Sequence, residues 1–392
     1  MQKKYLYGIA AIHFSNDISS GALPAVLPFF VLNYGLDYAS MAGLMFASAC
    51  LSSVIQPLFG FLSDKTSKMW FMPLGVFMTG TSLAIVGFVE SYWSIFTAVV
   101  FLGIGTAIFH PEAASLVNQV SGSKKGSGMS IFSVGGNGGF GIGPLLAVAV
   151  ITTFGMHGLA VFGIIGVVMG LVALYVIPRI KESALEKLEE AEAGNPSPQA
   201  SEPGTNDWHA FGKLTLVTIF RSIVFVGISS FLPIFCIHVL GASPVMGSST
   251  LSIMSISGIV MTLIGGYAAD RWGYIKVLRA GLLMLIPFMA IAFFGGNIWW
   301  VYAMLLPIAF AMFITYSPVV VLGQTYLGKN LGVASGITLG IALSAGGVAV
   351  PFLGKYGDIY GLESVMMILV IIAALCAFFS FFLPQPGKKS VL

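Results

Sequence analysis

The sequence predicts an all-α membrane protein with twelve transmembrane helices in two pseudo-repeated six-helix halves. Hydrophobic residues make up 57% of the 392 residues and charged residues only 8%, whereas a soluble domain carries about 25% charged residues. Apolar runs of about 20 residues recur from end to end, and each is long enough to cross a hydrocarbon core of roughly 30 Å as a helix. The short alternating segments of a transmembrane barrel do not occur in the sequence.

Length, charge and the placement of Gly and Pro define six spans in each half. In the first half we predict spans at 5–34, 38–62, 70–90, 92–118, 127–154 and 157–178. In the second half we predict spans at 210–239, 246–269, 276–295, 298–326, 332–354 and 362–383.

One long polar stretch, 180–209, separates the two sets of spans. It divides the chain into an N-terminal half (1–179), a cytoplasmic linker (180–209) and a C-terminal half (210–392). The first part of the linker, ESALEKLEEAEA, has the composition of a surface helix, and the Pro-rich remainder has that of a disordered segment.

The basic residues predict the orientation in the membrane. With both termini in the cytoplasm, every Lys and Arg except Arg221 and Lys355 falls on the cytoplasmic side, as the positive-inside rule requires. The Trp residues lie near the predicted span ends, where amphipathic rings meet the membrane interface. We therefore expect an even number of spans and cytoplasmic termini.

A loop motif occurs in both halves. GFLSDK follows span two and GYAADR follows span eight, 206 positions later. The glycines permit close helix approach, and the aspartates can accept N–H groups at a facing helix N-terminus and pair with the following basic residue. A tight turn with solvated charges is the alternative for one copy alone. We predict a cytoplasmic gate formed by Gly60, Asp64, Lys65, Gly266, Asp270 and Arg271. The doublet resembles the signature loop of the major facilitator superfamily.

Span five carries a stripe of small residues. Gly135, Gly139 and Gly143 recur at every fourth position and Pro144 follows, a spacing that favours tight helix packing and a kink. The stripe resembles the GxxxGP core of the antiporter motif in exporters of that superfamily, without the Gly pair that often follows. Packing alone would also explain it.

Ionisable residues inside predicted spans are the sharpest functional signal, because each costs about 2.5–3.5 kcal/mol near the bilayer centre. In span one, His13, Asn16, Asp17 and Ser20 share one helix face, which predicts a cavity lining. A satisfied interhelical hydrogen-bond cluster is the alternative.

Span four contains His110 and Glu112 on either side of Pro111. Residues two apart point in nearly opposite directions on an ideal helix, so both can face one cavity only if Pro111 distorts it. A structural hydrogen bond is the alternative role of His110.

Arg221 in span seven keeps its charge and requires a carboxylate or an anionic substrate. We expect Glu112 or Asp17 as its partner. A static ion pair between the halves is the alternative.

A resemblance to a known family covers the whole chain. Four segments carry it: HFSNDISSGALPAVLP in span one, GIGTAIFHPEAASLVNQVSG in span four, KKGSGMSIFSVGGNGGFGIGPLLA in span five and RSIVFVG in span seven. They are similar to the fosmidomycin resistance family of the major facilitator superfamily. The resemblance implies the major facilitator fold, proton-driven export and a bacterial inner membrane. It also implies a set of cavity residues: His13, Asn16, Asp17, His110, Glu112 and Arg221.

We therefore interpret the chain as a proton-coupled exporter that works by alternating access on a small polar or anionic compound, for example a drug such as fosmidomycin. Asp17 and Glu112 are the expected proton carriers, and Arg221 is the expected partner of an anion. Asn137, Gln56 and Tyr316 are further candidates for substrate contacts. A proton symporter that imports a small carboxylate or sugar, and a non-transporting membrane sensor, are the alternatives.

The expected partners are the substrate, protons and the lipid bilayer, with no nucleic acid, and we expect the monomer to be functional. No catalytic or metal-binding motif occurs in any span. We therefore expect no enzyme activity, no metal and no cofactor besides the proton gradient.

Overall fold

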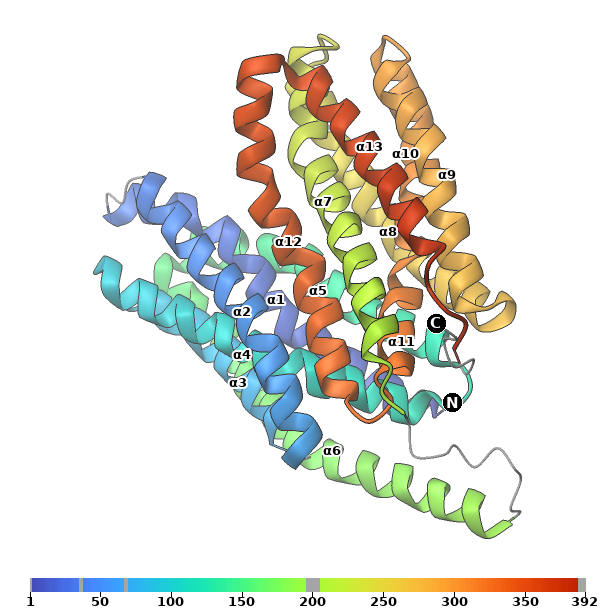
Figure 1. Ribbon diagram of the computed structural model, residues 1–392. Helices are drawn as coiled ribbons and strands as arrows, with labels where there is room; N and C mark the ends of the chain where they lie inside the picture. Colours follow the sequence, from blue (N-terminus) through green and yellow to red (C-terminus); the bar gives the residue numbers. More distant parts are fainter. Residues whose placement is uncertain (1, 35–37, 67–69, 195–204, 387–392) are drawn as a thin grey trace. The chain divides into compact units, whose positions relative to one another are not determined.

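A computed structural model describes residues 2–34, 38–66, 70–194 and 205–386, and within these ranges the chain is almost entirely helical (Figure 1). The helices of the first half are α1 (Lys3–Tyr34), α2 (Tyr38–Thr66), α3 (Phe71–Val86), α4 (Tyr92–Ser121), α5 (Lys125–Phe154), the short 3-10 helix η1 (Met156–Leu159) and α6 (Ala160–Gly194). Those of the second half are α7 (Trp208–His238), α8 (Pro244–Trp272), α9 (Tyr274–Phe294), α10 (Ile298–Phe313), α11 (Tyr316–Tyr326), α12 (Leu331–Tyr360) and α13 (Leu362–Ser380).

Each predicted span corresponds to an observed helix, with two exceptions. Span six, predicted over 157–178, begins in the 3-10 helix η1 and continues in α6. Span ten, predicted as one helix over 298–326, consists of α10 and α11, which are separated at Ile314–Thr315. Pro318 has no N–H group to donate to the carbonyl of Ile314, which favours an interruption of the helix at this point. Within the described residues, nine helices or helix pairs are long and apolar enough to cross a membrane, and α3 is a shorter apolar helix.

The predicted linker has two parts in the structure. α6 continues beyond the sixth span to Gly194 and so includes the segment predicted as a surface helix. Residues 195–204, predicted to be disordered, lie outside the described residues.

The helices form two compact units. Unit 1 comprises residues 1–123, 131–205 and 328–336, and unit 2 comprises 124–130, 206–327 and 337–392. Each unit therefore includes a short segment from the other half of the sequence, namely the first turns of α12 and of α5. The division at 1–179, 180–209 and 210–392 remains a prediction.

Glycines bring the helices of unit 1 close together. Gly75 on α3 and Gly105 on α4 face each other, so that a Cβ on either would press on the other's backbone carbonyl. Gly80 on α3 and Gly166 on α6 make a similar contact. Small residues at such crossings maximise van der Waals contact between helices in lipid.

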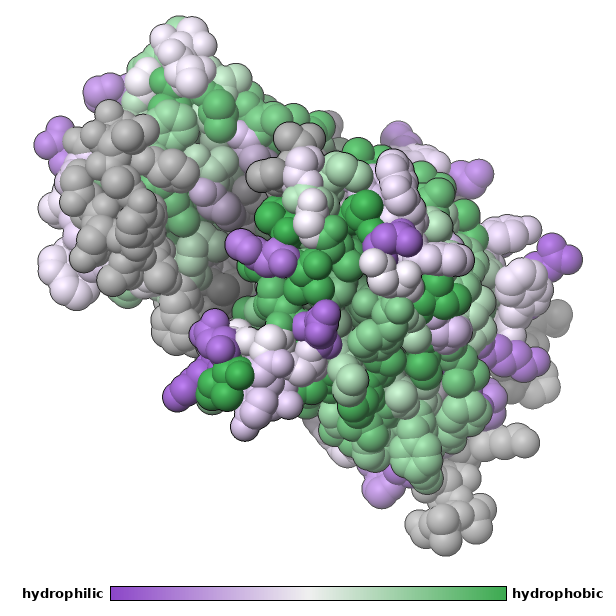
Figure 2. Space-filling view, turned by 90° about the horizontal axis from the view of Figure 1, so that it is seen from above, coloured by the Kyte–Doolittle hydropathy of each residue, from purple (hydrophilic) through white to green (hydrophobic). Residues whose placement is uncertain are grey.

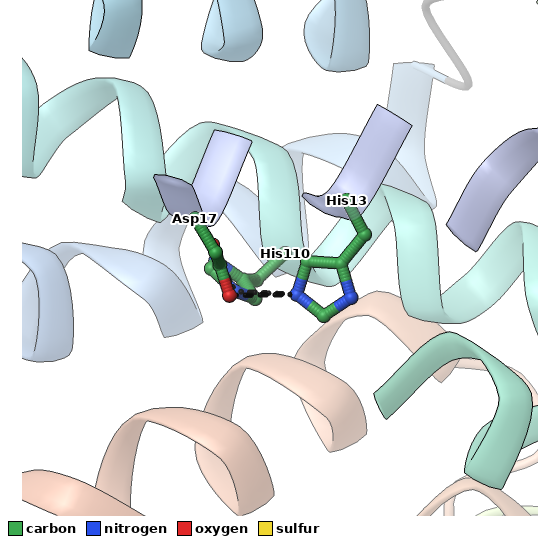
Figure 3. Close-up of side chains that lie close together, drawn as sticks. All are labelled: His13, Asp17 and His110. Atoms are coloured by element: carbon green, nitrogen blue, oxygen red, sulfur yellow. Dashed lines mark hydrogen bonds and ion pairs between the residues drawn. The ribbon is translucent and has the colours of Figure 1, made fainter. Parts of the chain in front are cut away.

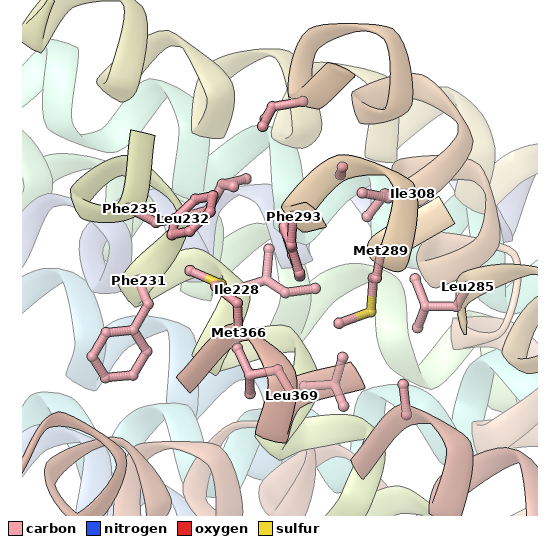
Figure 4. Close-up of a cluster of buried hydrophobic side chains, with 14 of the residues drawn as sticks. Ile228, Phe231, Leu232, Phe235, Leu285, Met289, Phe293, Ile308, Met366 and Leu369 are labelled. Carbon is pink, nitrogen blue, oxygen red and sulfur yellow. The ribbon is translucent and has the colours of Figure 1, made fainter. Parts of the chain in front are cut away.

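In unit 2, large apolar side chains of α7, α9, α10 and α13 interlock in one core. Figure 4 shows this cluster, which includes Phe231 and Phe235 of α7, Phe293 of α9, Ile308 of α10 and Met366 of α13.

Many large apolar side chains also face outward, among them Trp93, Leu145, Ile256 and Phe352, each about 70% exposed. Hydrophobic residues cover much of the surface that is visible in Figure 2. Such a surface suits a hydrocarbon solvent.

The glycine stripe of α5 lies against the backbone of α1 in unit 1. Cβ atoms at Gly135, Gly139 and Gly143 would meet the carbonyl oxygens of Ala10, Phe14 and Ile18. One α1 residue per turn thus faces one α5 glycine per turn, and the predicted packing stripe is observed at these three positions.

Gly139→Ala should therefore lower the apparent melting temperature of the purified protein in detergent, because overpacking costs about 1–3 kcal/mol. Gly141→Ala is the matched control on the same helix, since a Cβ there meets nothing within 4 Å. It should leave stability unchanged or raise it by up to ~1 kcal/mol. Equal melting temperatures for the two variants would contradict this packing.

Candidate functional site

The polar face of α1 is buried in unit 1. His13, Asn16 and Asp17 are at most 3% exposed, and Ser20 bonds to the hydroxyl of Thr106 on α4 at 2.9 Å. The i, i+3, i+4 and i+7 spacing therefore directs these polar groups into the unit interior.

A cluster of three ionisable side chains forms where this face meets α4. His13 Nε2 lies 3.0 Å from Asp17 Oδ2 and 3.2 Å from His110 Nε2, and His110 Nε2 lies 3.5 Å from Asp17 Oδ1. Figure 3 shows the three side chains directed toward one another. We call His13, Asp17 and His110 the His–Asp–His cluster.

Backbone carbonyls fix the orientation of both imidazole rings. His13 Nδ1 lies 2.7 Å from the carbonyl oxygen of Phe132 on α5, and His110 Nδ1 lies 2.9 Å from that of Thr106 on α4. The His13 ring also stacks on the Phe132 ring at 3.8 Å between centroids. Both Nε2 atoms therefore face the carboxylate.

Neutral polar groups complete the surroundings of Asp17. The Asn16 amide donates to Asp17 Oδ1 at 2.9 Å, and the Thr79 hydroxyl on α3 donates to Asn16 Oδ1 at 3.1 Å. Asp17 is thus held by groups from α1 and α4, and through Asn16 by α3.

His110 and Glu112 face different neighbours, as their spacing predicts when the helix is undistorted. α4 stays helical through Pro111. His110 contacts α1, whereas Glu112, which is 4% exposed, accepts a hydrogen bond from the Ser63 hydroxyl on α2.

Arg221 occupies the interior of unit 2 and is 6% exposed. Its Nε donates to Thr315 Oγ1 at 2.7 Å, and its Nη2 donates to the carbonyl oxygen of Met312 at 3.1 Å. The break between α10 and α11 presents both acceptors. Both acceptors are neutral, and the ion pairs of the described residues include none with Arg221. Its pairing with Asp17 or Glu112 remains a prediction.

The weaker substrate-contact candidates occupy different positions. Gln56 is buried on α2, and its Oε1 has no hydrogen-bond partner in the described part of the chain. Asn137 is half-buried and donates to Ser133 Oγ on the same helix at 3.3 Å. Tyr316 is half-buried at the start of α11, directly after Thr315.

Both copies of the loop motif cap a helix N-terminus. In unit 1, Asp64 accepts the N–H groups of Gly332 and Val333 at the start of α12, at 2.7 and 2.9 Å. Burial raises the pKa of the Asp64 carboxyl above its ordinary value, and these N–H groups oppose that rise because they stabilise the ionised form. The adjacent Lys65 is exposed and lies over the ring of Phe61, 4.3 Å from its centroid.

In unit 2, Asp270 accepts the N–H groups of Gly126 and Ser127 at the start of α5, both at 2.8 Å. The hydroxyls of Ser127 and Tyr274 also donate to it, at 2.6 and 2.7 Å. Arg271 is exposed. In each copy the glycine four residues earlier allows this approach, because Cβ atoms at Gly60 and Gly266 would overlap the backbones of Gly332 and Gly126. In both copies the aspartate thus accepts N–H groups at a helix N-terminus, and the role of the motif as a cytoplasmic gate remains a prediction.

The three side chains of the His–Asp–His cluster are also the residue types that bind metal ions. Their ligand atoms lie within 4.8 Å of one another, and in the described residues they form the one group of three with this property. A proton shared among these atoms accounts for the same distances, and we interpret the cluster as a hydrogen-bonded one.

Sequence reasoning missed several residues at these sites, among them Gly136, Ser63 and Thr315. Gly136 on α5 lies directly against the cluster, because a Cβ there would come within 2.6 Å of His13 Nε2 and 2.8 Å of Asp17 Oδ2. It falls between members of the every-fourth stripe, so the packing pattern did not identify it. The FSVGGNGG segment contains adjacent glycines. The glycine next to a member of the stripe indicates that another helix can also approach α5 closely on a neighbouring face.

Comparison with known proteins agrees with this architecture. The family model described as Major Facilitator Superfamily matches residues 9–351. The chain belongs to this superfamily. It is therefore a membrane transporter of small molecules and not an enzyme, and its fold class is the one predicted.

Relatives and solved structures cover nearly the whole chain. It is 27% identical to the fosmidomycin resistance protein of Escherichia coli (strain K12) over 388 residues, 98% of this chain and 93% of the relative. It is also 27% identical to the MFS-type transporter YfnC of Bacillus subtilis (strain 168), with 97% and 92% covered. The structure of the E. coli fucose:proton symporter FucP superposes with a TM-score of 0.76 at 15% identity, covering 97% of this chain and 98% of that one.

Asp270→Ala should lower the apparent melting temperature, because it leaves several partly buried donors without an acceptor, at a cost of up to about 3 kcal/mol. Asp358→Ala, which removes an exposed aspartate on α12, is the control and should have no effect. If both variants melt at the wild-type temperature, Asp270 does not hold the start of α5.

Gly136→Ala should displace His13 from Asp17 and abolish transport, while the protein still inserts and remains monodisperse in detergent. Gly141→Ala again serves as the control, and it should transport at the wild-type rate. Full transport by Gly136→Ala would show that the close contact beneath the cluster is not required.

Proposed function

We propose that this transporter exports a small polar or anionic compound in exchange for protons. The observation that carries the proposal is the His–Asp–His cluster, in which ionisable groups are buried within apolar helices long enough to cross a membrane. Such groups are costly in lipid and mark proton relays or substrate pathways in transporters. Groups that serve only packing would be replaced by apolar ones at lower cost.

The buried guanidinium of Arg221 supports an anionic substrate. Its acceptors in unit 2 are a hydroxyl and a carbonyl, so a full positive charge is available to an anion. Arg presents a planar fork of donors that matches carboxylate and phosphate groups. We assign it the recognition of the substrate's acidic group.

The export direction is supported by relatives whose names refer to drug resistance or efflux. These include the fosmidomycin resistance protein and the multi-drug resistance efflux pump PmrA of Streptococcus pneumoniae, which is 28% identical over 149 residues. The glycine stripe of α5, similar to the antiporter motif, supports the same direction.

The two aspartate caps supply contacts that can open and close during alternating access. Asp64 and Asp270 each bind N–H groups at a helix start, and such contacts are strong enough to hold one conformation without being permanent. We propose that they form the cytoplasmic gate, with both chain termini in the cytoplasm.

Proton-coupled uptake is the second candidate. A probable hexose phosphate transport protein of Chlamydia pneumoniae is 24% identical over 426 aligned positions, and the FucP structure is that of a symporter. A phosphorylated or carboxylated substrate would suit Arg221 equally well.

Proton flux in proteoliposomes decides between the two candidates. A panel of small phosphonates, phosphate esters and carboxylates, with fosmidomycin included, is added outside vesicles that contain a pH-sensitive dye. Exchange predicts that an active compound moves protons in the direction opposite to its own movement. Movement of protons and compound in the same direction would reject the export proposal in favour of symport.

Arg221→Lys should raise the KM for the active compound at least tenfold, because Lys retains the charge but loses the fork of donors. Arg279→Lys is the control, since Arg279 donates to the carbonyl oxygens of Ser380, Phe381 and Leu383 at the end of α13. An unchanged KM in Arg221→Lys would exclude Arg221 from substrate recognition.

A further inference from the structure

The orientation of the two imidazole rings constrains where protons reside in the His–Asp–His cluster. A backbone carbonyl is only an acceptor. Since Nδ1 of His13 and Nδ1 of His110 each contact a carbonyl oxygen at 2.7 and 2.9 Å, each Nδ1 must carry a hydrogen. In a neutral ring, the other nitrogen, Nε2, then carries a lone pair and can only accept a hydrogen bond. It can donate one only when the ring is protonated to an imidazolium.

With two neutral rings, the contacts between the rings and the carboxylate would join acceptors alone, since the Asn16 amide donates only to Asp17 Oδ1. Both Nε2 lone pairs and both carboxylate oxygens would face one another, at separations of 3.0 and 3.2 Å for the two shortest pairs. Buried acceptors without a donor cost several kcal/mol in an apolar environment. This proton-free state is therefore unfavourable in the observed geometry.

With both rings protonated, two N–H donors would face each other. The Nε2 atoms are 3.2 Å apart, too close for two hydrogens directed at one another. Two imidazolium charges would also exceed the single charge of Asp17. Among the described neighbours, Thr79, Phe109, Phe132 and Gly136 are uncharged, and Glu112 accepts a hydrogen bond from Ser63 on α2.

One added proton satisfies the two shortest contacts, and Asp17 Oδ1, 3.5 Å from His110 Nε2, accepts from Asn16 instead. Placed at His13 Nε2, this proton lies within hydrogen-bond distance of both Asp17 Oδ2 and His110 Nε2. The cluster is then electrically neutral, with one imidazolium, one carboxylate and one neutral ring. Asp17 remains ionised throughout and fixes the position of the proton.

We infer that the exchangeable proton is held as a single proton shared by Nε2 of His13 and Nε2 of His110, with Asp17 as its permanent counter-charge rather than its carrier. This inference rests on the proposed proton exchange and identifies its binding atoms. When the proton is lost, the lone pairs of His13 Nε2 and His110 Nε2 face each other and repel. Because these rings belong to α1 and α4, deprotonation weakens the contact between the two helices. That change links proton release to movement within unit 1.

Nitrogen NMR of the two rings tests the inference without any substrate. The chain has five histidines, and His157→Gln, His209→Gln and His238→Gln together leave only the two of interest. In this variant, labelled with ¹⁵N-histidine and placed in lipid nanodiscs at pH 8, we expect three ring N–H protons over the two rings. Both Nδ1 atoms should be protonated, and one proton should exchange between the Nε2 atoms.

Adding Asp17→Asn to the same variant should remove the third proton, because the counter-charge is lost, and leave two neutral rings that are protonated at Nδ1. Two ring protons in the presence of Asp17, or four, would overturn the inference. Stoichiometric zinc or another transition metal in elemental analysis of the purified protein would also overturn it, since the metal would occupy the Nε2 lone pairs.

The transport assay separates this result from the proposed function. If wild-type protein shows no substrate-linked proton movement, the exchange mechanism fails whatever the ring protonation. If the wild type exchanges protons and His110→Gln exchanges them with unchanged stoichiometry, the exchange stands and the assignment to the imidazole pair is wrong. We expect His110→Gln to lose proton movement at least tenfold while it still binds the compound.

Discussion

The structure of unit 1 is organised around the cost of one buried carboxylate. Asp17 is buried on α1, where an unpaired charge would be strongly destabilising. Every polar group near it compensates that cost: two imidazoles contact the carboxylate directly, and Asn16 donates to it. Because His110 comes from α4 and the His13 ring is anchored on α5, the same interactions fix how α1, α4 and α5 pack.

Small residues make this arrangement possible. α5 can approach α1 closely enough for the Phe132 carbonyl to reach His13 because glycines at three successive turns replace side chains along the contact. Gly136 serves a different purpose on a neighbouring face, where the absence of a side chain leaves room for the His–Asp–His cluster. One glycine-rich segment thus meets a packing requirement and an electrostatic one.

The two units handle buried charge differently. Unit 1 surrounds an acid with bases from two helices, whereas unit 2 surrounds a base with neutral oxygens at a helix break. The loop motifs of the two units are alike. In each, the aspartate caps the start of a helix, and the glycine four residues earlier has no side chain that would prevent the close approach of that helix. The two loop motifs therefore share one geometry, whereas the buried charged sites of the two units differ in chemistry.

Much of the fold could be predicted from the sequence because lipid imposes a simple rule: each span must be a long apolar helix. Charge, length and Pro placement therefore located nearly all helices to within a few residues. The break between α10 and α11 escaped prediction because both pieces are apolar, and hydropathy does not distinguish one helix from two.

The candidate site was only partly predictable. Periodicity correctly placed His13 and Asp17 on one face of α1, and the two-residue spacing of His110 and Glu112 indicated that they diverge. The contact of His110 with Asp17 depends on which faces of α1 and α4 meet, and no local pattern contains that information. For the same reason Ser63 and Thr315 could not be identified, since their roles arise from residues distant in sequence.

Proton release on substrate binding tests the central claim most directly. Purified wild-type protein in weakly buffered detergent solution, mixed with an active compound and a pH indicator, should release about one proton per molecule bound. Protein carrying both His13→Gln and His110→Gln should bind the compound and release none. Equal release from the wild type and this variant would contradict the account, because the proton would then come from a group outside the His–Asp–His cluster.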